Sequence, residues 1–229
     1  MRYSRSLETL RAHIRWIRPH KWFPADDPIA TSVAKLCVLR EDLYIEFLAL
    51  AANEISLTLP NVPEGTSVPG LDDNGEEYRR VYFLRASLRT LSEVRGAVTQ
   101  LWQNKNFRKL YETFDQKKYQ ELSGYIKRLE KNLKELKRIR NGLGGHVLAE
   151  AIITALNTMP YEEIGRFQTG PKIKDTHFGF AGTICAQVLL QDVPKDKRES
   201  HLIQITNLNN KTLEIISDIL TAYVFHKGL

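Results

Sequence analysis

Cysteine is scarce in this chain, since only Cys37 and Cys185 occur among 229 residues. Both lie in apolar runs, and neither belongs to a CxxC pair or to a set of ligands spaced for zinc. We interpret them as buried thiols, and a disulfide between them is the alternative. This usage is typical of a reducing compartment, so we expect a cytoplasmic protein.

Long hydrophobic runs are also missing. No stretch of about 18 apolar residues occurs, and the basic N-terminus is not followed by an uninterrupted apolar segment. We therefore expect neither a membrane span nor a signal peptide, and no contact with membranes.

Several motifs that define enzyme classes are absent as well. The sequence has no P-loop, no GxGxxG after a strand and no GxSxG elbow, which argues against nucleotide-dependent kinases, dinucleotide oxidoreductases and α/β-hydrolases. Asp42 and Glu46 are one helical turn apart, but no ExxH or HxxxH partner accompanies them. We therefore predict no metal site and no cofactor.

Positive charge, by contrast, is plentiful and unevenly distributed. The formal net charge is +6, but residues 105–140 carry +7 and residues 1–23 carry +5, whereas residues 24–104 carry −5. A lysine-rich helix is most often a solvated face, yet charge of one sign gathered in this way also suits a polyanion. Charge alone leaves both interpretations open.

Hydrophobic periodicity predicts an all-α protein, a bundle of about six to seven helices in a single domain spanning residues 1–229. Residues 57–75 contain repeated proline and glycine and predict a long loop. A short β-hairpin is possible near residues 161–175. The helical patterns cover residues 6–18, 28–55, 76–103, 107–114, 116–140, 147–159, 178–191 and 197–225.

The stretch RNGLGGH, residues 140–146, interrupts the helical pattern directly after the lysine-rich segment. Its glycines allow the first helix to end, so Arg140 lies at one helix end and His146 near the start of the next. Arginine keeps its charge at any working pH, imidazole titrates near neutrality, and helix N-termini favour anions. These groups could converge on one phosphate.

Metal-independent RNA cleavage needs a base for the attacking 2′-hydroxyl, an acid for the leaving 5′-oxygen and positive charge on the phosphorane. Histidine suits the proton transfers and arginine suits the charge. The 2′-hydroxyl attacks and the 5′-oxygen leaves on opposite sides of the phosphorus. Two copies of the motif in a symmetric dimer would therefore supply a histidine for each proton transfer, which a single copy would not. The alternative is structural: Arg140 caps its helix, the glycines turn the chain, and His146 is a surface residue.

Arg140, followed by Asn141 and then His146, resembles the Rx4-6H motif of the HEPN superfamily. The resemblance implies a dimerising helical bundle and, in catalytic members, a metal-independent endoribonuclease of toxin, phage-defence or RNA-processing type. It assigns the catalytic pair to Arg140 and His146 and a supporting role to Asn141. It also implies a homodimer and a possible antitoxin or nucleotidyltransferase-like protein partner.

RNA is the partner that we expect from the basic segment leading to the motif, because phosphate neutralisation by clustered cations drives such binding. The alternative function is a helical adaptor without catalysis that binds nucleic acid or an acidic protein. We predict that nucleic acid is contacted by Lys127, Arg128, Lys131, Lys134, Lys137 and Arg138.

Overall fold

The computed structural model describes residues 18–51, 76–139, 148–163, 178, 180–190 and 193–227. Within these ranges the structure contains eight α-helices, one 3-10 helix and no strand, so the prediction of an all-α helical bundle is confirmed. The helices are α1 (Pro19–Trp22), α2 (Pro28–Ala51), α3 (Glu76–Gln103), α4 (Lys105–Phe114), α5 (Gln116–Ile139), α6 (Ala149–Thr158), α7 (Phe180–Leu190) and α8 (Arg198–His226), and the 3-10 helix is η3 (Lys195–Lys197).

Side-chain caps fix where three of these helices begin. The Asp27 carboxylate accepts hydrogen bonds from the backbone amides of Ile29 at 2.8 Å and Ala30 at 3.2 Å, directly before the proline that opens α2. Such a cap satisfies amides that have no partner inside the helix. Asn104 caps α4 in the same way, so α4 begins two residues earlier than the apolar pattern predicts.

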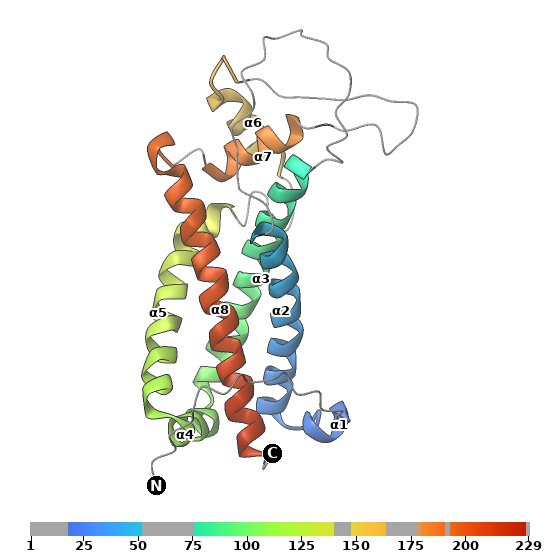
Figure 1. Cartoon of the computed structure of the whole chain (residues 1–229), viewed down its shortest axis with the longest axis vertical. Helices are drawn as coiled ribbons and strands as arrows, with labels where there is room; N and C mark the ends of the chain where they lie inside the picture. Colours follow the sequence, from blue (N-terminus) through green and yellow to red (C-terminus); the bar gives the residue numbers. More distant parts are fainter. Residues whose placement is uncertain are drawn as a thin grey trace, which may run out of the picture.

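The four long helices α2, α3, α5 and α8 run side by side, α4 closes one end of the bundle, and α6 and α7 lie beyond the other end (Figure 1). Both α3 and α8 contact α2, and both also contact α5. Figure 1 shows α2 and α5 on opposite sides of α8. The outer faces of α2 and α5 therefore point away from each other.

The last helix, α8, supplies much of the core. Its predicted apolar stripe is buried at Ile205, Ile215, Ile219 and Tyr223, whereas Leu208 is only partly buried. The buried face of α8 also contains Asn209, which is fully buried and whose side chain has no hydrogen-bond partner among the described residues. An asparagine among apolar neighbours was not expected from the sequence pattern.

The two cysteines are both free thiols. Cys185 is buried, but Cys37 is only half-buried, because it lies at the edge of the buried face of α2. No helix in the described ranges is long and apolar enough to cross a bilayer.

Some sequence predictions fall outside the described residues. These are the helix over residues 6–17, the loop over 57–75 and most of the hairpin near 161–175. Of that hairpin, residues 161–163 are described, and they form a turn after α6.

A carboxyl group is buried where α2 meets α3. The side chain of Glu46 is only 7% exposed, and one of its oxygens accepts a hydrogen bond from the Thr90 hydroxyl at 2.9 Å, while the other has no partner. Burial raises the pKa of Glu46 to about 7, the bond from Thr90 lowers it in part, and nearby Asp42 raises it further.

We predict that Glu46 makes folding stability fall as pH rises from about 4.5 to about 7. Over that window the folded protein holds a proton that the unfolded chain releases, so higher pH favours unfolding. Glu46→Gln removes the ionisable group and should raise the free energy of unfolding at pH 8 by about 1–3 kcal/mol, with little change at pH 4. Urea denaturation across this pH range measures the effect. The exposed Glu112→Gln is the control, and an equal pH dependence in both variants would contradict the assignment.

Candidate nucleic-acid interface

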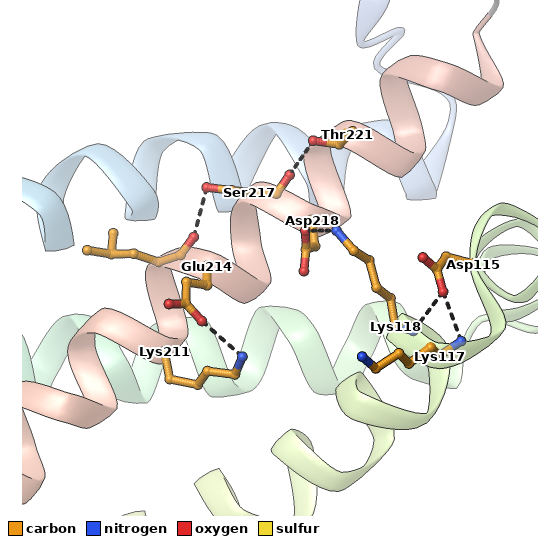
Figure 2. A network of polar contacts seen from close by, with 9 residues as sticks. Asp115, Lys117, Lys118, Lys211, Glu214, Ser217, Asp218 and Thr221 are labelled. Carbon is orange, nitrogen blue, oxygen red and sulfur yellow. Dashed lines mark hydrogen bonds and ion pairs between the residues drawn. The ribbon is translucent and has the colours of Figure 1, made fainter. Parts of the chain in front are cut away.

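The basic helix α5 is anchored to α8 at its first turn. The Asp115 carboxylate accepts hydrogen bonds from the backbone amides of Lys117 at 2.9 Å and Lys118 at 3.1 Å. The ammonium group of Lys118 forms an ion pair with Asp218 of α8 (Figure 2). This contact commits one lysine of the basic segment to a structural role.

A second polar contact fixes the rotation of α5 about its axis. The hydroxyl of Tyr125 lies 2.7 Å from that of Thr212 in the buried interface of α5 and α8. Thr212 donates to the carbonyl of Leu208, so Tyr125 is the donor to Thr212. Leu122 and Leu129 are buried on the same side of α5. The opposite side of the helix consequently faces solvent.

That solvent side is what we call the cationic face of α5, defined by Lys117, Lys127, Arg128 and Lys131. All four side chains are exposed. None of them forms an ion pair with a residue that the structure describes. Counted from Lys117, the later cations follow after about three and four helical turns, so the face extends about 21 Å.

The middle of the cationic face is open, because a side-chain carbon built on Gly124 meets nothing within 4 Å. An exposed cation that is not in an ion pair can bind an anionic ligand directly, whereas a cation in an ion pair must first lose its carboxylate partner. This arrangement suits a flexible anionic chain that lies along the helix, with phosphates held by charge rather than by a shaped pocket.

Three of the six predicted nucleic-acid contacts, Lys127, Arg128 and Lys131, are thus on the exposed face. The backbone of residues 134, 137 and 138 belongs to α5, but the side chains of Lys134, Lys137 and Arg138 lie outside the described residues. Lys117 was not among the predicted contacts, although its spacing of eleven residues from Arg128 places both on one side of a helix.

The predicted catalytic residues Arg140, Asn141 and His146 also lie outside the described residues, between the end of α5 and the start of α6. Their mutual geometry therefore remains a prediction. Elsewhere in the described part, no group of three histidine, cysteine, aspartate or glutamate side chains is placed to hold a metal ion.

Comparison with known proteins adds no family assignment. No model of a protein family, no curated protein and no solved structure matches this chain.

We predict that the cationic face can be neutralised without loss of stability. The triple variant Lys127→Gln, Arg128→Gln, Lys131→Gln should unfold within about 0.5 kcal/mol of wild type, because these side chains are exposed and form no ion pair with a described residue. Tyr125→Phe, which removes a buried hydrogen bond, should cost about 0.5–1.5 kcal/mol. Urea denaturation compares the two, and a larger loss in the triple variant would show that the cations support the fold.

Proposed function

We propose that the chain binds RNA along the cationic face of α5 and cleaves it without a metal ion at Arg140 and His146. The observation that carries the binding is the row of exposed cations on one side of α5, none of which forms an ion pair with a described residue. The helix continues along the chain to Ile139, directly before the motif. RNA held by α5 would therefore be delivered to the residue types that phosphate cleavage requires.

The chemistry follows from the residue types. A neutral His146 imidazole would take the proton of a 2′-hydroxyl as its oxygen attacks the adjacent phosphorus. Arg140 would stabilise the charge on the non-bridging oxygens, and a protonated imidazole would donate a proton to the leaving 5′-oxygen. The base and the acid act on opposite sides of the phosphorus, so a second copy of the chain would supply the second His146 across a two-fold axis. Asn141 would help to orient Arg140.

A second candidate is a non-catalytic adaptor that binds RNA and a protein. It is favoured by the exposed side chains of Val38 (63% exposed) and Ile45 (60% exposed), which are seven residues apart on the outer face of α2. An apolar stripe of this kind suits a protein contact. The α2 stripe and the cationic face of α5 point in opposite directions, so both could be occupied at once.

We predict that RNA binding depends on salt and on the cationic face of α5. For single-stranded nucleic acid, the plot of log K against log salt concentration becomes shallower by about 0.7 for each phosphate contact that is removed. The Lys127→Gln, Arg128→Gln, Lys131→Gln variant should therefore show a slope shallower by about 2, measured by fluorescence anisotropy with labelled RNA.

The control for this measurement is the triple variant Lys35→Gln, Arg40→Gln, Lys197→Gln, which makes the same change of net charge on α2 and η3. It should bind RNA nearly as wild type does. Equal slopes in both triple variants would show that net charge alone drives binding, and would remove α5 as the interface.

We predict that the purified protein cleaves RNA in excess chelator and leaves 2′,3′-cyclic phosphate ends, which are the product of attack by the 2′-hydroxyl. Arg140→Ala and His146→Ala should each lower the rate by at least about 100-fold. Binding should persist in His146→Ala. No cleavage of varied RNAs by wild type, together with salt-sensitive binding, would leave the adaptor as the function; equal cleavage by all three proteins would indicate a contaminant.

A further inference from the structure

Two aromatic rings meet at the end of the bundle where α5 begins. Phe225, on the last turn of α8, is 66% exposed, and its ring centre lies 5.5 Å from that of Phe114, the last residue of α4. Phe114 is partly buried and packs against the core, which fixes the position of its ring. The ring of Phe225 thus rests on a fixed neighbour while most of its surface faces solvent.

The ion pair between Lys118 and Asp218 links this aromatic pair to α5. Phe225 follows Asp218 by seven residues, which is two helical turns on the same face of α8, about 10 Å along the axis. Phe114 precedes Lys117 by three residues, across the cap formed by Asp115. The aromatic pair therefore lies at the end of the bundle where α5, and with it the cationic face, begins.

Charges of both signs lie near the pair in the sequence: Asp115 follows Phe114 directly, the exposed Glu112 precedes it by two residues, and Lys117 follows it by three. Asp218 is neutralised by Lys118, and Asp115 is engaged by the amides at the start of α5. Lys117 is exposed and forms no ion pair with a described residue. A nucleotide could stack its base on the exposed aromatic ring and place its phosphate near the Lys117 ammonium group.

We propose that the Phe114–Phe225 pair is a stacking platform for an unpaired nucleobase, at one end of a single-stranded RNA path along α5. This inference rests on the proposed RNA-binding function. Base stacking on aromatic side chains tolerates any sequence, because every base presents a π face. The platform requires an unpaired base, so the preferred ligand is single-stranded RNA and not a duplex.

The experiment measures the affinity of labelled 12-nucleotide oligo(A) for wild type and for variants of Phe225. Phe225→Ala should weaken binding about tenfold, and Phe225→Leu should weaken it similarly, because leucine keeps the apolar contact but lacks the ring. Phe225→Tyr should bind as wild type does. Ile203→Ala, which truncates an exposed apolar residue near the other end of α8, is the control and should have no effect.

A spectroscopic measurement separates stacking from a general loss of structure. Two RNAs are compared, each with the fluorescent base 2-aminopurine at one of its two ends. The RNA whose labelled end reaches the platform should lose fluorescence on binding wild type, and it should keep its fluorescence with Phe225→Ala. Helical content of each variant is checked by circular dichroism.

The outcomes separate this inference from the proposed function. Salt-sensitive RNA binding with equal affinities for wild type and Phe225→Ala would overturn the platform and leave binding along α5 intact. Equal affinity of Phe225→Leu and wild type would overturn stacking in favour of a simple apolar contact. Failure of wild type to bind any RNA would overturn both.

Discussion

The burial of α8 between α2 and α5 is the interaction on which the rest of the structure depends. Each of the other long helices has an apolar face that is covered only in part by its neighbours in sequence, and α8 contacts all of them. Its buried residues, such as Ile216 and Ile219, are fully removed from water. The hydrophobic effect is proportional to the apolar area removed from water, so this one helix stabilises the bundle through its interfaces with α2, α3 and α5.

The same packing separates two surfaces of different character. Because α3 and α8 lie between α2 and α5, the apolar stripe with Val38 and Ile45 and the cationic face with Arg128 point away from each other. Polar contacts set the orientation of α5: the Tyr125–Thr212 hydrogen bond and the Lys118–Asp218 ion pair hold one side against α8, and the remaining cations are left to solvent. A basic sequence becomes a basic surface only through this anchoring.

Most helices could be predicted from the sequence because their signals are local. Helix-breaking proline and glycine residues and a periodic apolar stripe predicted both ends of α3, and the capping residue Asp115 predicted the start of α5. The short helix α1 was missed, because it is held by distant contacts, including the stacking of Phe23 on Tyr223. For the same reason Tyr125 was missed: its partner, Thr212, is 87 residues away, and the leucine pattern alone gives no sign of it. The basic character of α5 was predictable, but which cations are exposed depends on α8.

The contact between Tyr223 and the end of α1 bears on how the protein folds during its synthesis. Alongside the stacking of Phe23 on Tyr223, the Tyr223 hydroxyl donates to the carbonyl of Trp22 at 2.7 Å, a bond between residues 201 positions apart. A contact of such long range closes only after the intervening chain has been made, and contacts of this kind are slow to form. The parts of the hydrophobic faces of α2 and α3 that α8 covers therefore stay exposed on the nascent chain until α8 has left the ribosome, so they are available to chaperones during translation.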